Sequence, residues 1–269
     1  MPEGHTLHRL ARDQTLAFAG RPVHVTSPQG RFAAGAALLD GRVLDEVASH
    51  GKHLFACFGA DTLHVHLGLY GTYTSGEGSP PPPRGALRMR WEGAGPDGLG
   101  VWTDLRGATA CEVLTAPEVD HILDRLGPDP LRPRSDGSVA HRRIAGSRTA
   151  IGALLMDQSV LAGVGNVYRA EILFRHGVSP FRPGRDVDAD TWAAMWADLV
   201  VLMRSGVRMG RIVTTRPEHR DRRSGAVRRE DAHYVYRRTG LPCRVCGTPV
   251  QTQVMVGRNL YWCPVCQAV

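Results

Sequence analysis

The 269-residue sequence predicts an α+β protein of several domains, because three regions of the chain differ in their residue pattern. Short apolar segments separated by glycine and proline fill residues 22–114, which is typical of a two-sheet β-sandwich. Beyond residue 137 the apolar side chains recur with helical spacing. Two close pairs of cysteines near the C-terminus have the spacing of a zinc-finger hairpin. We therefore expect a β-sandwich, a helical domain and a zinc finger, in that order.

The composition narrows the class of protein further. The sequence contains no run of about 20 apolar residues, so we expect no membrane span. We also find no signal-peptide pattern before the charged and polar residues that begin at Glu3. We therefore expect a cytoplasmic protein without a membrane partner. The formal net charge of +7 favours a polyanionic partner such as nucleic acid.

One basic residue differs from all the others. Lys52 is the only lysine among 33 basic residues, and the rest are arginine. The base composition of the source genome is enough to account for this bias towards arginine. Lysine can nevertheless lose its proton, whereas arginine keeps its charge, so Lys52 is a candidate acid or base.

The chain begins Met1-Pro2-Glu3. Removal of Met1 before a small residue such as Pro2 would leave a secondary amine, and a terminal amine has a pKa near ~8. An unprotonated amine of this kind attacks an electrophilic sugar carbon and forms an iminium, which is the Schiff-base route of covalent catalysis. Glu3 would supply a carboxyl group for general acid or base chemistry. The alternative is an ordinary processed N-terminus followed by a capping acid.

The elements of the first region follow from its apolar pattern. Leu7, Leu10 and Leu16 share a helical stripe, which predicts a helix over residues 6–17 with Thr6 as its N-cap. Residues 80–83 are consecutive prolines and predict a surface loop. Strands are predicted at residues 23–25, 42–44, 53–55, 62–67, 87–91 and 100–102.

The chain then changes character over residues 116–136. A short helix is predicted over residues 119–126, and the proline-rich residues 127–133 that follow predict an interdomain hinge. The predicted domains are the β-sandwich at residues 1–115, the hinge at 116–136, a helical domain at 137–230 and the zinc finger at 231–269.

Helices dominate the predicted second domain. Two short helices are expected at residues 150–158 and 166–176, and a longer one begins at Asp188 or Asp190. The Gly163-Val164-Gly165 segment before the second helix is either a packing turn or a site where backbone N–H groups bind a phosphate. Nine arginines between Arg204 and Arg229 predict either a solvated loop or a lid that contacts phosphates.

The four C-terminal cysteines carry the strongest single signal. Two Cys-x-x-Cys pairs of thiolates form a closed tetrahedral site, which is typical of one structural zinc; a redox or iron site is the alternative. Strands are predicted at residues 248–256 and 259–262, so Arg258 would lie at the hairpin tip, either as a structural residue or aimed at DNA. The cysteines are Cys243, Cys246, Cys263 and Cys266.

Taken together, these motifs resemble one family, the formamidopyrimidine-DNA glycosylase and endonuclease VIII enzymes of base-excision repair. The resemblance extends over nearly the whole chain in the same order. The matching motifs are Pro2-Glu3-Gly4, Gly51-Lys52-His53-Leu54, His66-Leu67-Gly68-Leu69-Tyr70-Gly71, Leu126-Gly127-Pro128-Asp129, Asp157-Gln158 through Gly163-Val164-Gly165-Asn166, Tyr234-Val235-Tyr236 and Arg258.

The resemblance implies a catalytic role for four residues. Pro2 would be the nucleophile at the deoxyribose C1′, and Glu3 the acid that helps to open the sugar. Lys52 and Arg258 would assist the elimination steps or hold phosphates.

The resemblance also implies DNA-binding residues. Leu69 and Tyr70 would fill the gap left by an extruded base. Asn166 would grip the DNA backbone, and Arg106 would contact DNA as well.

The expected function is that of a monomeric, bifunctional DNA glycosylase and abasic-site lyase acting on damaged DNA. The aromatic residue expected after Asp104-Leu105-Arg106 is replaced by Gly107-Ala108, which weakens the oxidised-purine branch of the family. The pair Leu69-Tyr70 favours the endonuclease VIII branch, whose members prefer oxidised pyrimidines. Two alternatives stay open: a glycosylase preferring oxidised purines, and an inactive zinc-containing DNA-binding protein on the same scaffold.

Overall fold

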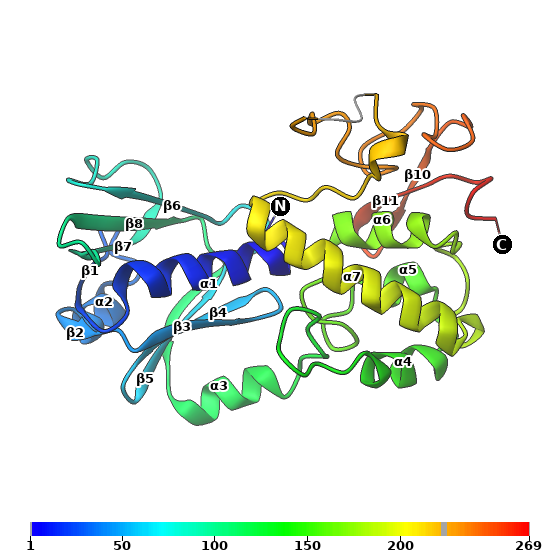
Figure 1. Cartoon of the computed structure of the whole chain (residues 1–269). Coiled ribbons are helices and arrows are strands. Elements are labelled where there is room, and N and C mark those ends of the chain that lie inside the picture. The colour runs from blue at the N-terminus through cyan, green and yellow to red at the C-terminus, as the bar shows by residue number, and fades with distance from the viewer. Residues whose placement is uncertain (1, 222–224, 269) are drawn as a thin grey trace. The chain divides into compact units, whose positions relative to one another are not determined.

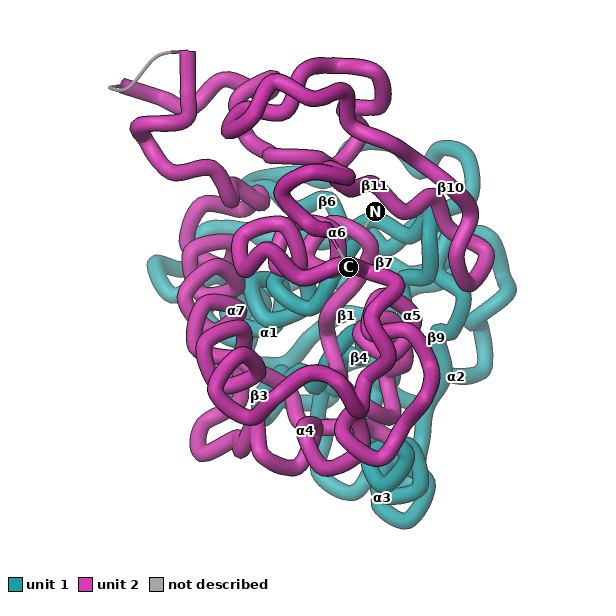
Figure 2. Tube along the Cα trace, turned by 90° about the vertical axis from the view of Figure 1, so that its right-hand side faces the viewer, with its two compact units in different colours: residues 1–125 teal, residues 126–269 magenta. Residues whose placement is uncertain are grey.

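The computed structural model describes residues 2–221 and 225–268 (Figure 1). The chain divides between Arg125 and Leu126 into two compact units, which are coloured separately in Figure 2. The division falls inside the segment for which a hinge is expected. No helix in the described part of the chain combines the length and apolar character that a bilayer crossing requires.

The first unit is a β-sandwich with a helix at its start. One sheet has the strand order β2-β1-β7-β8-β6 and the other β3-β4-β5-β9, and all pairings are antiparallel. Helix α1 (Gly4–Phe18) packs against β3 and β4. The remaining elements are β1 (Pro22–Thr26), α2 (Ala33–Leu39), β2 (Arg42–Val43), β3 (Glu46–His50), β4 (His53–Phe58), β5 (Asp61–His66), β6 (Thr72–Glu77), β7 (Leu87–Ala94), β8 (Gly100–Arg106), β9 (Ala110–Leu114) and α3 (Ala116–Leu123).

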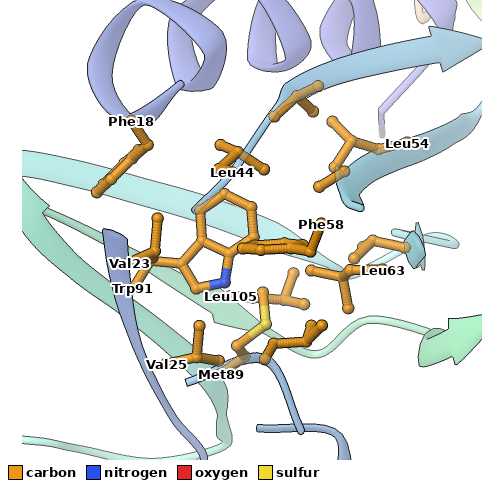
Figure 3. Packing of buried hydrophobic residues seen from close by; sticks show 14 of the residues in the cluster. Phe18, Val23, Val25, Leu44, Leu54, Phe58, Leu63, Met89, Trp91 and Leu105 are labelled. Atoms are coloured by element: carbon orange, nitrogen blue, oxygen red, sulfur yellow. The ribbon is translucent and has the colours of Figure 1, made fainter. Parts of the chain in front are cut away.

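The core of this unit lies where apolar side chains of both sheets and α1 meet (Figure 3). Trp91 of β7 is fully buried, and its ring meets the edges of Phe18 and Phe58 at centroid distances of 5.7 and 5.9 Å. T-shaped aromatic pairs of this kind add about 0.5–1.5 kcal/mol each to the effect of burial alone. The packing therefore fixes α1, and with it the chain start, on the sandwich.

The sequence prediction for α1 is wrong at its first turn. The helix begins at Gly4 rather than after Thr6, and Glu3 occupies the N-cap position with extended backbone angles. The backbone carbonyl of Glu3 accepts a hydrogen bond from the Thr6 amide at 2.8 Å, so Thr6 already lies inside the first turn. Only two residues, Pro2 and Glu3, therefore separate the first helical residue from Met1.

The second unit begins with helices packed around one apolar cluster. They are α4 (Gly137–Ala145), α5 (Ile151–Leu154), α6 (Asn166–Arg175) and α7 (Ala189–Met209). Asp188 caps α7 by accepting a hydrogen bond from the Thr191 amide, which confirms one of the two predicted starts. The predicted α7 stripe is confirmed as core, since Trp192, Met195 and Leu199 are buried.

Two helix boundaries differ from the sequence prediction. Helix α5 ends at Leu154, because the amides of Met156 and Asp157 bond back only three residues and turn the chain. Helix α3 starts at Ala116 because Thr115 and Glu118 form a capping box, in which the Glu118 carboxylate accepts from the Thr115 amide at 2.8 Å.

The C-terminal hairpin belongs to this second unit and does not form a compact unit of its own. It consists of β10 (Gln251–Met255) and β11 (Arg258–Trp262), joined by a tight turn in which Val256 and Gly257 both have positive φ angles. Helix α6 packs against β11. Ala170 and Phe174 of α6 share an apolar cluster with Tyr234, Cys243 and Cys263.

Candidate functional site

The chain start lies at the edge of a cavity. Pro2 is half-buried and lines a cavity of about 340 Å³ together with residues of α1 and the β5–β6 segment. Next to it, Glu3 is fully buried at the N-terminus of α1. The other lining residues are Thr6, Leu10, Leu67, Leu69, Tyr70, Gly71, Thr72 and Tyr73. Pro2 and the neighbouring carboxyl group of Glu3 are thus close to a space that can hold part of a ligand.

Two apolar side chains project from the loop that borders the same cavity. Tyr70 is 84% exposed and Leu69 is 39% exposed, although both are large and apolar. The loop is held by a hydrogen bond from the Gly71 amide to the Leu67 carbonyl at 2.9 Å, and Gly68 adopts a φ of +63°. Exposed aromatic and aliphatic side chains on a fixed turn are suited to stack on, or insert between, bases.

Lys52 lies in the two-residue turn that joins β3 to β4. The turn is closed by the pairing of His50 with His53, and Gly51 supplies the positive φ of 59° that the turn needs. Burial is the main cause that lowers the pKa of His66, followed by the positive charges of His64 and Lys52. Lys52 therefore lies at the end of the sheet where His53 of β4 pairs with His66 of β5.

Arg106 is bound to its own sheet. Its guanidinium pairs with the buried Asp104 at 2.9 Å and donates to the Thr74 hydroxyl at 3.1 Å. The buried Arg90 also donates two hydrogen bonds to Asp104, one to each carboxylate oxygen. Two arginines therefore share this one carboxylate. Hydrogen bonding by Arg90 and Arg106 lowers the pKa of Asp104 despite the opposing effect of burial. Sequence reasoning missed Asp104 as the organising group.

Asn166 and the hairpin of Arg258 lie together in the second unit. Asn166 is the first residue of α6, and its side-chain amide donates to the backbone carbonyl of Asn259 at 2.9 Å. Its carbonyl oxygen accepts from Arg169, which is itself buried. Arg258, the residue before Asn259, is half-buried at the start of β11. The geometry thus joins the predicted Gly-Val-Gly-Asn motif to the predicted hairpin tip.

The four predicted metal ligands converge. Their sulfur atoms all lie within 4.8 Å of one another, with Sγ–Sγ distances of 3.9 Å for Cys243–Cys266 and 3.4 Å for Cys246–Cys263. Tetrahedral zinc with Zn–S bonds of about 2.3 Å requires sulfurs about 3.8 Å apart. The four thiolates fit this ion. Among the described residues, they form the only group of this kind.

Two histidines near the site make the first unit sensitive to acid. Burial lowers the pKa of His5 to about 4 and that of His53 to about 3, from an ordinary value of 6.5. The unfolded chain therefore binds more protons below pH 6.5, and the stability gained above that pH is lost as the pH falls. At about pH 4.5 the two groups together would lower the free energy of unfolding by roughly 5 kcal/mol.

We expect urea unfolding of the full chain to show this loss between pH 7 and about pH 4.5. The variant His5→Gln should lose less stability on acidification, whereas His121→Gln, at an exposed position of α3, should behave like the original chain. Equal acid sensitivity in all three proteins would contradict the assignment.

Comparison with known proteins identifies the family. Three family models match: the formamidopyrimidine-DNA glycosylase N-terminal domain at residues 1–111, its H2TH domain at 126–218, and the zinc finger found in FPG and IleRS at 240–269. The chain is 53% identical to Endonuclease 8 1 of Mycobacterium tuberculosis, with 99% of this chain and 100% of the relative covered. It is 35% identical to the DNA-(apurinic or apyrimidinic site) lyase Nei2 of Mycolicibacterium smegmatis, with 99% of each covered.

A solved structure shows the same fold. The complex of Lactococcus lactis Fpg with DNA containing an abasic site superposes with a TM-score of 0.80 at 19% identity, covering 99% of this chain and 100% of that one. The matching domains span most of the chain, and a relative at 53% identity covers its full length. The chain belongs to the formamidopyrimidine-DNA glycosylase and endonuclease VIII family of DNA repair glycosylases and lyases.

Proposed function

We propose that this chain is a bifunctional DNA glycosylase and abasic-site lyase that removes oxidised bases, pyrimidines in preference to purines. The observation that carries the proposal is Pro2 at the edge of a cavity, with the buried Glu3 beside it and Leu69 and Tyr70 on its rim. Relatives named Endonuclease 8 1 and DNA-(apurinic or apyrimidinic site) lyase support both parts of the activity.

The proposed reaction begins with the amine of Pro2 after removal of Met1. Its nitrogen attacks C1′ of the damaged nucleotide, and the bond from C1′ to the base breaks as the base leaves with a proton. Glu3 supplies the proton that lets the sugar ring open, and the iminium between Pro2 and C1′ forms.

Elimination then cleaves the strand. The iminium makes the C2′ proton acidic, so loss of that proton expels the 3′ phosphate, and a second elimination expels the 5′ phosphate. Water finally hydrolyses the iminium and regenerates Pro2. Lys52 and Arg258 assist the elimination steps or hold the phosphates, and Asn166 holds the DNA backbone.

The lesion preference rests on the loop that follows Arg106. Gly107 has a φ of 61°, and a Cβ built there would come within 3.3 Å of the Tyr70 carbonyl. The segment therefore packs its backbone against the Leu69-Tyr70 turn and contributes no aromatic side chain of its own. We call Leu69 and Tyr70, which would fill the gap left by the extruded base, the wedge. Because the Gly107 segment adds no aromatic side chain to the wedge, the endonuclease VIII type of lesion preference is favoured.

A lesion panel tests the proposal directly. Purified protein would be incubated with duplexes carrying an oxidised pyrimidine, an oxidised purine or an abasic site, and borohydride would trap any iminium. We expect trapping with the pyrimidine lesion and the abasic site, and slower trapping with the purine lesion. The reverse order would support the purine alternative, and binding without trapping would identify an inactive DNA-binding protein.

The wedge makes a separate prediction. The double variant Leu69→Ala, Tyr70→Ala should slow excision of a damaged base much more than cleavage at a preformed abasic site, because an abasic site has no base to extrude. Unstacking costs a few kcal/mol, so excision should fall by roughly 100-fold. Single-turnover rates on the two substrates measure the difference. Equal losses on both would show that the pair only packs the loop.

The metal and the assembly complete the proposal. Cys243, Cys246, Cys263 and Cys266 hold one structural zinc per chain, which supplies no chemistry to the reaction and fixes the hairpin that carries Arg258. The chain acts as a monomer on damaged DNA in the cytoplasm, where the nucleoid lies.

A further inference from the structure

One face of the second sheet carries an unusual row of histidines. Residues paired across an antiparallel sheet lie on the same face, and His53 pairs with His66 while His64 pairs with Glu112. The opposite face, with Leu54 and Val65, packs into the sandwich core. The histidines therefore lie on the face of this sheet that points away from the sandwich core.

These side chains form a continuous hydrogen-bonded chain. Nδ1 of His64 lies 2.9 Å from a carboxylate oxygen of Glu112, and Nε2 of His64 lies 2.9 Å from Nδ1 of His53. The ring of His53 is then 4.9 Å from that of His66. The Glu112 side chain is 52% exposed, whereas His64 is buried. The chain runs from the protein surface to the turn that carries Lys52.

The chemistry of the partners fixes the direction of the donors. A carboxylate only accepts, so His64 donates from Nδ1 and, when neutral, accepts at Nε2. His53 must then donate from Nδ1, which leaves its Nε2 as an acceptor. Burial lowers the pKa of both His53 and His64, and Glu112 only partly offsets this for His64, so both rings are neutral at pH 7.

Titratable and charged groups from several elements act on this chain. The groups that act on His53 are His64, His66, His50 and Arg125, and Lys52 acts on His66. The negatively charged group that acts on His64 is the carboxylate of Glu112. Lys52 directly precedes His53, so a change in the His53 ring reaches the β3–β4 turn without an intervening residue.

We propose that Glu112, His64 and His53 form a positioning chain for Lys52, which holds the β3–β4 turn at the pair of His50 and His53 that closes it. The inference rests on the proposed function in one respect, namely that Lys52 takes part in the elimination steps. The three residues themselves are positioning residues.

A spectroscopic test uses the fact that Lys52 is the only lysine of the chain. In full-length protein labelled with ¹⁵N-lysine, the side-chain signal comes from this residue alone. We expect Glu112→Gln and His64→Phe to shift the pH at which that signal titrates, since each breaks a hydrogen bond of the chain that holds the turn around Lys52. The matched control is Glu46→Gln, at an exposed position on β3 of the same sheet, which should leave the signal unchanged. Identical titration curves in all four proteins would overturn the proposal.

A kinetic test measures how the loss of the His64 hydrogen bonds changes the rate of strand cleavage. His64→Phe keeps the ring that stacks on Phe55 but has no nitrogen, so packing survives while both hydrogen bonds are lost. We expect strand cleavage at an abasic site to slow roughly tenfold, because small misplacement of a positioned group can cost about 100-fold. Borohydride trapping should be retained. In a Lys52→Ala background, His64→Phe should have no further effect.

The outcomes separate the two proposals. Additive losses in the double variant would show that His64 acts independently of Lys52 and would overturn the positioning chain while leaving the glycosylase intact. Absence of trapping in the original protein would contradict the proposed function, and the lysine titration would still decide whether the chain acts on Lys52.

Discussion

Protein that retains Met1 is expected to form no borohydride-trapped complex with abasic DNA, although it should still bind that DNA. A retained Met1 turns the Pro2 nitrogen into a tertiary amide, which has neither an N–H nor a basic lone pair. Covalent catalysis through an amine is then impossible. Binding should survive because Asn166, Arg258 and the arginines between Arg204 and Arg229 do not depend on the chain start.

Two substitutions sharpen this result. Pro2→Gly leaves a primary amine and should retain some lyase activity. Glu3→Gln should lose excision of damaged bases far more than abasic-site cleavage, because the ring-opened aldehyde form of an abasic site needs no sugar opening. Trapping yields for mature, Met1-retained, Pro2→Gly and Glu3→Gln proteins provide the measurement. If the Met1-retained protein trapped as well as the mature one, Pro2 would not be the nucleophile and Lys52 would be the next candidate.

Changing any one of the four zinc ligands to serine should release the metal and unfold the hairpin. Structural zinc contributes apparent binding free energies of about 10–16 kcal/mol in small metal domains, and this energy supports folding. Cys243 and Cys263 are buried among side chains that also pack on α6. The damage should therefore reach beyond the hairpin and weaken binding through Asn166, whose amide bonds to β11.

Metal analysis and thermal unfolding of purified protein measure this effect. We expect one zinc per chain in the original protein and almost none in Cys263→Ser. The sequence provides matched controls in Cys57→Ser and Cys111→Ser, since both of these cysteines lie outside the cluster and should leave the zinc content unchanged. Fully active protein without zinc would contradict the structural role.

The elements that sequence reasoning found are those with a strong apolar period. Helix α7 was predictable because Trp192, Met195 and Leu199 recur on one stripe below a capping aspartate. Strand β6 was not, since its sequence TYTSGE is mostly polar and exposed, and only pairing with β8 makes it a strand. Helix α2 was missed for a similar reason, because its four alanines and one glycine give a weak apolar period.

The site was predictable as a set of motifs and not as a set of contacts. Pro2, Lys52 and the cysteines carry chemistry that their residue types reveal. The chain from Glu112 through His64 depends on strand register, and register follows from pairings that a single sequence does not specify. The alternation of His64 and His66 along one predicted strand was the available signal, since alternate residues share a face.

Glu171 of α6 has a consequence for how the chain is assembled during synthesis. This fully buried carboxylate accepts hydrogen bonds from the backbone amides of Tyr234, Val235 and Tyr236 at 2.7 to 2.9 Å, and from the Thr214 hydroxyl. Until residues 234–236 have left the ribosome, the Glu171 carboxylate lacks the three backbone amides that bind it. A buried unpaired charge is costly, so the helix cannot settle in its final place early. Residues 234–236 thus complete the packing of α6 in the second unit, and a chain that stops before them should be prone to degradation.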